Sequence, residues 1–450
     1  MLGVRSVDGR FRRLRTAAYA ALIAILLAIP WFSIEGEPLV LLDVPARKFH
    51  VLGLVIYPQE LYFLWLILAA LALALFFFTA LFGRVWCGWA CPQTVFTDLF
   101  AAVARRLQGW RGLTPPPRVP AWRRAATYLA FVALSLVLGF HLVAYFRPPR
   151  DLLQALAHGE LRSTSFTFLL AGSFLAFFDF VVLRQTFCKY LCPYARFQGV
   201  IFDGDTLVIG YDAARGEPRG KVAKRLAAAG AAPARGDCVD CGLCVAVCPT
   251  NIDIRKGMQM ECIACTQCID ACDGVMTQLG RATNLIGYRS LVSLTGERPA
   301  RILRPRVALY GALLLAVSLA FAVALSRRLP MDLYVAHNHD TLYVRAADGR
   351  VGNSFKLHIQ NRDRSEGVFA VRVVEDGFDL VAGVNPIRVP ATDEVEAQVF
   401  VLAEEEDLAG PTAPIHFVLE REGPGAARVV RAARFLAPDA TGGDGHDRDR

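Results

Sequence analysis

The sequence is poor in charged side chains and has no cysteine beyond residue 272. Only 20% of its 450 residues are charged and 54% are hydrophobic, which is too apolar for an ordinary soluble protein and predicts membrane-spanning helices. All twelve cysteines stand in metal-type spacings, so we expect a reducing compartment around them and no disulfide framework. The net charge of +8 is carried largely by arginine, which in a membrane protein orients the chain and does not indicate nucleic-acid binding.

Five apolar runs are each near the ~20 residues that a helix needs to cross a bilayer. They cover residues 17–32, 60–82, 125–146, 166–183 and 307–325. The first run is short and follows an arginine-rich stretch, as in a signal peptide, but no A-x-A-like cleavage site comes after it. We therefore expect an uncleaved first helix, about five spans in an α-helical transmembrane bundle, and the lipid bilayer as a partner.

The distribution of arginine predicts the orientation of these spans. Arginines are frequent before the first span, in the 83–124 loop and in the 184–306 segment, whereas the 33–59 and 147–165 loops carry fewer positive charges. By the positive-inside rule, the N-terminus and the cysteine-rich segment are cytoplasmic, and the chain after residue 325 is periplasmic.

Eight cysteines fall within residues 238–272, in two runs of C-x2-C-x2-C-x3-C. Three thiolates of such a run bind three irons of a cubane, and in two-cluster ferredoxins the fourth cysteine of each run serves the other cluster. We assign Cys238, Cys241, Cys244 and Cys272 to one [4Fe–4S] cluster, and Cys248, Cys262, Cys265 and Cys268 to a second. Zinc is the alternative, but a zinc ribbon uses two C-x2-C pairs separated by a longer loop. A C-x2-C-x2-C run would therefore have one cysteine more than such a pair needs. A domain with two [4Fe–4S] clusters is expected to transfer single electrons.

The other four cysteines form two C-x3-C-P motifs, each just past the end of a span. Residues i and i+4 share a face of a helix and a following proline disfavours its continuation, so we expect each pair at a helix end with both thiols on one side. Cys87, Cys91, Cys188 and Cys192 then converge at the membrane surface beside the clusters. Soft thiolates select Cu(I), zinc or iron–sulfur centres, and because no further cluster-type run is present, a redox-active metal beside an electron relay suggests copper. The alternative is that they are small buried residues at helix ends.

Three further candidates are weaker. His141 and Asp179 are ionisable residues within predicted spans, which indicates either a functional role or a structural one with a polar partner. His337 and His339 form an H-x-H just beyond the last span, either a copper site or solvated loop histidines.

From residue 331 to about 438 the hydrophobic pattern changes to a period of two, with about seven short strands separated by turn signals. This pattern predicts an all-β, immunoglobulin-like sandwich without a disulfide. Our division of the chain is a transmembrane region, a linker containing a short strand in DTLVIGYD, a ferredoxin-type domain, a fifth span, the sandwich and a disordered tail. The boundaries are 1–200, 201–236, 237–300, 301–328, 329–438 and 439–450.

The chain resembles the cytochrome c oxidase accessory proteins of the CcoG family, also called FixG or RdxA. The resemblance rests on GRVWCGWACPQTVF at 83–96, CKYLCPYARFQGVIFDGDTL at 188–207 and ECIACTQCIDACDGVM at 261–276, and on the sandwich entry DGRVGNSFKLHIQN at 348–361. Two departures, Asn251 after CPT and NLIGY at 284–288, touch no predicted ligand.

The resemblance implies a multi-pass protein of the bacterial inner membrane that reduces Cu(II) to Cu(I) during assembly of the copper centre of a cbb3-type cytochrome c oxidase. Copper is then a substrate, and Cys87, Cys91, Cys188 and Cys192 are its binding or redox residues. The implied partners are oxidase subunits or copper chaperones and a cytoplasmic electron donor. Two alternatives stay open: an electron relay from quinol to the periplasm without a metal substrate, and an assembly scaffold without redox function.

Overall fold

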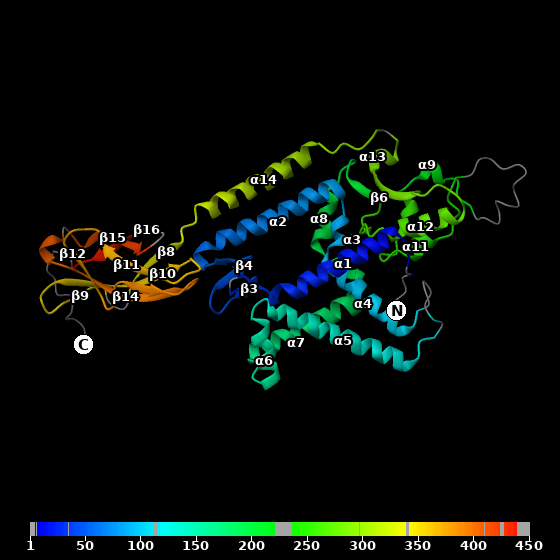
Figure 1. Ribbon diagram of the computed structural model, residues 1–450. Coiled ribbons are helices and arrows are strands. Elements are labelled where there is room, and N and C mark those ends of the chain that lie inside the picture. The colour runs from blue at the N-terminus through cyan, green and yellow to red at the C-terminus, as the bar shows by residue number, and fades with distance from the viewer. Residues whose placement is uncertain are drawn as a thin grey trace, which may run out of the picture. The chain divides into compact units, whose positions relative to one another are not determined.

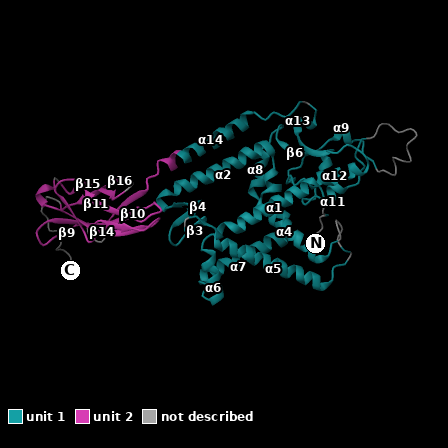
Figure 2. Ribbon diagram, viewed as in Figure 1, with its two compact units in different colours: residues 1–322 teal, residues 323–450 magenta. Residues whose placement is uncertain are grey.

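The computed structural model describes residues 5, 7–34, 36–110, 116, 118–220, 236–296, 298–338, 342–408, 410–423 and 427–438. The chain forms two compact units, residues 1–322 and 323–450 (Figures 1 and 2). The predicted tail 439–450 and most of the alanine-rich part of the predicted linker lie outside the described residues.

Five helices in the described part of the chain are long and apolar enough to cross a membrane. They are α1 (Arg10–Ala28), α2 (Leu61–Phe82), α5 (Ala121–Ala144), α7 (Ser163–Phe177) with its π-helical extension η3 (Phe178–Leu183), and α14 (Pro305–Ser326). Helix α1 begins earlier than the predicted residue 17. Its first backbone N–H groups are bound by Asp270, which accepts from Phe11 N at 3.1 Å and from Arg12 N at 2.7 Å.

Four of the five candidate spanning helices pack in two pairs. Helix α5 lies against α7, where a Cβ on Gly139 would come within 2.7 Å of the Leu169 carbonyl oxygen, so only glycine allows this approach. Helix α2 runs beside α14 (Figure 1), and Phe63 and Phe321 meet edge to face at 5.9 Å between ring centroids.

Short elements connect the spans. After α1 come strands that form a two-stranded and a three-stranded antiparallel sheet. Their bounds are β1 (Ser33–Ile34), β2 (Glu37–Pro38), β3 (Val40–Asp43), β4 (Lys48–Val51) and β5 (Leu54–Ile56). Helices near the cysteine motifs and between the spans are α3 (Val85–Trp89), α4 (Pro92–Gln108), α6 (Pro149–His158), η4 (Phe187–Leu191) and α8 (Pro193–Ile201).

The ferredoxin region is built on a two-stranded antiparallel ribbon. Strand β6 (Leu207–Tyr211) pairs with β7 (Ile286–Ser290), and their apolar faces pack on helices α11 (Leu243–Ala246) and α12 (Gln267–Gln278). The strand predicted in DTLVIGYD is therefore present. Our assignment of this stretch to a linker is corrected, because the side chains of β6 are buried in the same core as the cluster cysteines.

The C-terminal unit is a sandwich of two antiparallel sheets, as expected. One sheet has the order β12-β14-β10-β8, with β9 beside β10, and the other has the order β13-β11-β15-β16. The strands are β8 (Met331–His337), β9 (Val344–Arg345), β10 (Val351–Asn361), β11 (Gly367–Val373), β12 (Phe378–Ala382), β13 (Ile387–Val389), β14 (Glu394–Ala403), β15 (Thr412–Arg421) and β16 (Arg428–Leu436). Alternate residues of the long strands fill the core, which is the origin of the period-two pattern.

Candidate functional site: two thiol cages beside a four-thiol site

The eight cysteines of the ferredoxin region line two cavities. One cavity is walled by Cys238, Cys241, Cys244 and Cys272. The other is walled by Cys248, Cys262, Cys265 and Cys268, with Cys244 contributing as well. The wall of each cavity contains the four cysteines predicted from the spacing to bind one cluster, and Cys244 borders both cavities. The role of each cysteine as a ligand stays a prediction.

The chemistry of these cavities fits iron–sulfur clusters. Burial raises the pKa of Cys262 and of Cys272 to about 12, and that of Cys244 to about 11. A lone thiolate is therefore disfavoured there, whereas bound iron offsets the negative charge and displaces the proton. A [4Fe–4S] cluster held by such thiols supplies one-electron transfer.

Each C-x3-C-P motif bridges two helices, which corrects our expectation that both thiols lie on one face of a single helix. Cys87 lies in α3 and Cys188 in η4, whereas Cys91 and Cys192 are the extended residues immediately before α4 and α8. The following proline opens the next helix, because its fixed φ suits the first helical position and holds the preceding residue extended.

The four thiols are close enough to influence one another electrostatically. Burial, followed by the neighbouring thiols of Cys91, Cys87 and Cys192, raises the pKa of Cys188 to about 12. Burial also raises the pKa of Cys87 to about 11, although the positive charge of Arg84 opposes it. Among the described residues, no three His, Cys, Asp or Glu side chains stand at the spacing of ligands to one metal ion. The thiols are therefore neighbours that would have to draw together around a metal ion.

The first C-x3-C motif rests directly on the second thiol cage. A Cβ on Gly88 would come within 2.6 Å of the Ile263 carbonyl oxygen and 2.7 Å of the Ala264 carbonyl oxygen. These two residues lie between Cys262 and Cys265. The absence of a side chain at position 88 thus lets the four-thiol site and the cage share a backbone contact.

Two more contacts hold this junction together. The hydroxyl of Tyr19 on α1 donates to the Gly88 carbonyl oxygen at 2.6 Å. Trp89 Nε1 donates to the hydroxyl of Tyr288 on β7 at 3.2 Å. The sequence analysis missed Gly88 and Tyr19, although a glycine between two motif cysteines is a signal for close backbone approach.

The weaker candidates have local partners. Asp179 accepts a hydrogen bond from Nε2 of Gln93 at 3.0 Å, and Gln93 lies two residues after Cys91 in the chain. His141 accepts from Trp31 Nε1 at 3.4 Å, and its Nδ1 lies 2.8 Å from the Val137 carbonyl oxygen. His337 packs in the sandwich, where its ring contacts Phe355 and its Nε2 lies 3.1 Å from Asn353 Oδ1. His339 lies outside the described residues.

Three family models match parts of the chain. A 4Fe-4S dicluster domain covers residues 183–291, a 4Fe-4S binding domain covers residues 63–111, and the Ig-like fold at the C-terminus of FixG covers residues 321–438. Iron–sulfur clusters and the immunoglobulin-like fold of the sandwich are thus confirmed.

Curated relatives span nearly the whole chain. Protein RdxA of Cereibacter sphaeroides is 36% identical over 85% of this chain and 83% of its own length. Protein RdxB of the same organism is 34% identical over 89% of this chain and 88% of its own length. Nitrogen fixation protein FixG of Rhizobium meliloti is 31% identical over 97% of this chain and 93% of its own length. The chain therefore belongs to the FixG/RdxA family, as a multi-pass iron–sulfur protein of electron transfer.

Proposed function

We propose that the chain is a cupric reductase that supplies Cu(I) for the copper centre of a cbb3-type cytochrome c oxidase. The observation that carries this proposal is the contact between Gly88 and the backbone of residues 263 and 264. This contact supports the proposal because it joins the motif of Cys87 and Cys91, two of four half-buried thiols, to a cysteine cage suited to a one-electron cofactor.

The residues of the four-thiol site suit both the substrate and the product. Reduction of Cu²⁺ to Cu⁺ takes one electron, which an iron–sulfur centre held by Cys248, Cys262, Cys265 and Cys268 would supply. Cys87, Cys91, Cys188 and Cys192 favour the product, because soft thiolates bind Cu(I) best. Their partial burial keeps water from the metal, and Gln198 Nε2, 3.6 Å from Cys87 Sγ, orients one of the thiols.

We further propose that the cysteine-rich region is cytoplasmic and the sandwich periplasmic. A cytoplasmic donor then reduces the iron–sulfur centres, and oxidase subunits or copper chaperones take up the Cu(I). The excess of arginine in the loops on one side of the spans supports this orientation. Membrane-impermeant thiol labelling of intact cells that carry Lys356→Cys, an exposed position of the sandwich, checks it against wild-type cells. Labelling of this position only after the membrane is broken would reverse the orientation.

A single-turnover experiment tests the reductase proposal. The full chain, purified anaerobically, is reduced, freed of excess reductant and mixed with Cu(II), while cluster absorbance and a Cu(I) chelator are followed together. We expect equal numbers of electrons lost by the clusters and Cu(I) formed. The Cys87→Ser/Cys91→Ser variant is expected to keep its iron but lose Cu(I) formation, whereas Cys241→Ser loses iron as well.

Two outcomes contradict the proposal. Undiminished Cu(I) formation by the double variant places copper elsewhere. Loss of iron from the double variant would assign the four thiols to a further iron–sulfur centre. The match of a 4Fe-4S binding domain to residues 63–111, which include Cys87 and Cys91, is the reason to test this alternative.

A second candidate function is electron relay from quinol without a metal substrate. It is favoured by an apolar cavity of about 600 Å³ between α1, α4, α5 and α7, with Asp179 and His141 in its wall. Oxidation of a quinol releases two electrons and two protons, and these two side chains offer proton acceptors. Reduction of the clusters by a quinol analogue without copper, lost in Asp179→Asn, would support this function. An assembly scaffold without redox function would show neither activity.

A further inference from the structure

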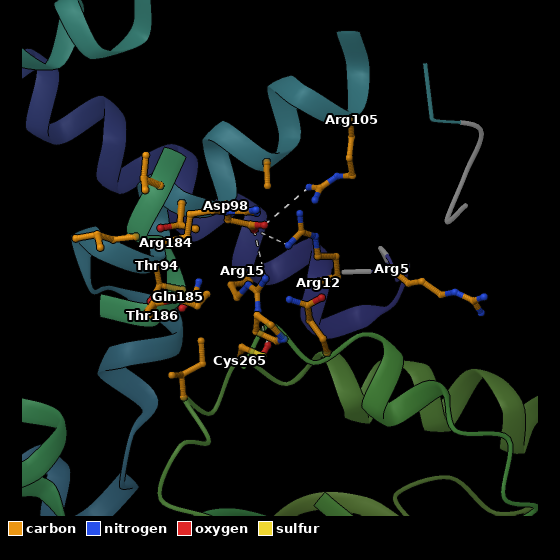
Figure 3. Close-up of a pocket in the computed structure, with 17 residues that line it drawn as sticks. Arg5, Arg12, Arg15, Thr94, Asp98, Arg105, Arg184, Gln185, Thr186 and Cys265 are labelled. Atoms are coloured by element: carbon orange, nitrogen blue, oxygen red, sulfur yellow. Dashed lines mark hydrogen bonds and ion pairs between the residues drawn. The ribbon is translucent and has the colours of Figure 1, made fainter. Parts of the chain in front are cut away.

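A cavity of about 250 Å³ lies between the beginning of α1, helix α4 and the segment just after η3 (Figure 3). Its wall is unusually rich in arginine. The arginines are Arg5, Arg12, Arg15, Arg105 and Arg184. The cavity adjoins the second cysteine cage, since Ile263 and Cys265 line both, but none of the functions proposed above uses it.

The positive charge of this cavity is far from balanced. Among the residues that the structure describes, Asp98 is the one carboxylate in its wall, and it lies 2.5 Å from Arg12, 3.3 Å from Arg15 and 3.8 Å from Arg105 (Figure 3). Three guanidinium groups, those of Arg12, Arg15 and Arg105, thus share a single carboxylate, so positive charge is in excess around Asp98. Burial lowers the pKa of Arg105, and repulsion from Arg12, Arg15 and Arg184 lowers it further, against the attraction of Asp98.

The cavity wall also offers polar atoms that have no protein partner. Arg15 is only 2% exposed, yet its Nε has no hydrogen-bond partner in the described part of the chain. The same holds there for Thr94 Oγ1, a second donor for an anion, and for Gln185 Oε1, which as an acceptor would bind water rather than a phosphate oxygen. Buried polar atoms of this kind are costly unless a ligand or water satisfies them. The positive-inside rule requires only arginines exposed in a loop. It therefore does not explain why the buried side chain of Arg15 lines a cavity.

We propose that this cavity binds a phosphate group, held by the guanidinium groups of Arg15, Arg105 and Arg184. Arginine forks match the oxygen geometry of phosphate and form charge-assisted hydrogen bonds with it. The cavity lies where α1 begins and η3 ends, which is the level of lipid headgroups. The phosphate comes either from an anionic phospholipid or from a soluble molecule, and the chemistry of recognition is the same.

The position of the site gives a bound phosphate a route to the second cysteine cage. Arg15 Nη1 donates to the Cys265 carbonyl oxygen at 2.6 Å, while its other nitrogens face Asp98 and the cavity. A dianion beside Arg15 offsets part of the positive charge that stabilises added electrons in that cage. Binding of phosphate is therefore expected to lower the reduction potential of the centre bound by Cys265.

The test uses the full chain with its clusters, purified anaerobically in mild detergent. Native mass spectrometry measures retained phospholipid, and calorimetry of delipidated protein measures binding of inorganic phosphate. Arg105→Gln and Arg184→Gln are each expected to weaken retention or binding by roughly tenfold, the loss of a charged hydrogen bond. The matched control is Arg106→Gln, because Arg106 follows Arg105 on α4 but is exposed and does not line the cavity.

The two sources of phosphate give different results. A lipid ligand is retained through purification, and protein in nanodiscs of anionic lipid has a lower cluster potential than protein in zwitterionic nanodiscs. A soluble ligand leaves no retained lipid, and inorganic phosphate then binds and lowers the potential in either lipid. Wild-type protein that neither retains anionic phospholipid nor binds phosphate overturns the proposal even if a variant fails to fold. The proposal is also overturned if Arg106→Gln weakens lipid retention or phosphate binding as much as Arg105→Gln does. Equal losses would indicate nonspecific electrostatic attraction rather than a site in the cavity.

Discussion

The hydroxyl of Tyr19 donates a 2.6 Å hydrogen bond to the carbonyl oxygen of Gly88 and so joins the first spanning helix to the first C-x3-C motif. On the other side, the same glycine touches the backbone of Ala264. A residue without a side chain therefore connects a membrane helix, the four-thiol site and the loop between Cys262 and Cys265. Changes at this junction should affect stability and electron transfer together.

Gly88→Ala is expected to separate the motif from the cage. The added methyl would lie 2.6 Å from the Ile263 carbonyl oxygen, so the backbone must shift, at a cost of about 1–3 kcal/mol. Thermal unfolding and single-turnover Cu(I) formation measure the two consequences. Gly274→Ala on α12 is the matched control, because a Cβ there meets no atom within 4 Å. Equal rates in the two variants would disprove the importance of this contact for electron transfer.

Tyr19→Phe removes only the hydroxyl and leaves the Gly88 carbonyl oxygen without its buried donor. We expect a loss of about 1–3 kcal/mol in stability, because an unsatisfied buried acceptor keeps its desolvation cost. Tyr128→Phe on α5 is the control, since that ring is exposed in the protein and should face lipid. Detergent-solubilised protein of both variants is compared by thermal unfolding, and equal stability of the two would contradict the prediction.

The crossed assignment of cysteines predicts that spectra group by cavity. Cys248→Ser belongs to the first run in the sequence but to the second cavity in space. Its paramagnetic resonance spectrum after reduction should therefore resemble that of Cys262→Ser and differ from that of Cys238→Ser. Each variant should lose roughly half of the iron. A spectrum of Cys248→Ser that matches Cys238→Ser would reverse the assignment.

Leu357→Ala should destabilise the sandwich. Leu357 on β10 is 0% exposed, and truncation of a core leucine costs about 2–5 kcal/mol. The neighbouring Lys356 points outward and forms an exposed ion pair with Glu396, so Lys356→Ala should change stability by less than about 1 kcal/mol. Limited proteolysis of the C-terminal unit distinguishes the two variants. Equal protease resistance would contradict the packing described.

Acid should weaken the sandwich through Asp363. The hydrogen bond from Arg421 lowers the pKa of Asp363 below its usual value, against the opposing effect of burial. Stability from this pair is therefore present above the unfolded pKa of about 4 and is lost as the pH falls through the lower folded pKa. Asp363→Asn should unfold at a lower temperature than wild type at pH 7, and the difference should shrink toward zero in acid. A difference that does not depend on pH would contradict this role.

The sequence predicted features that depend on local spacing. The two cysteine runs, the five apolar segments, the strand at 207–211 and the period-two sandwich all reflect spacing or periodicity along the chain. The division of the thiols between two clusters stays a prediction, drawn from the short spacers that leave each cubane one ligand short.

Contacts between distant segments could not be predicted. The approach of Gly88 to Ala264 joins residues far apart in the chain, and nothing near either of them identifies the partner. The prediction that both thiols of a C-x3-C motif share one helix was wrong. It used proline only as a sign that a helix ends, whereas Pro92 is the first residue of the next helix, α4. The cavity around Asp98 was missed for a related reason: its arginines were counted only as signals of orientation.

The bond between Asp270 and the beginning of α1 has a consequence for biogenesis. The carboxylate accepts from Arg12 N across 258 positions of the chain. The first helix is synthesised long before its anchor, so Asp270 cannot bind its leading N–H groups until the chain has been made as far as residue 270. Completion of the iron–sulfur region then fixes the earliest part of the chain, and the helix that is synthesised first is among the last to reach its final place.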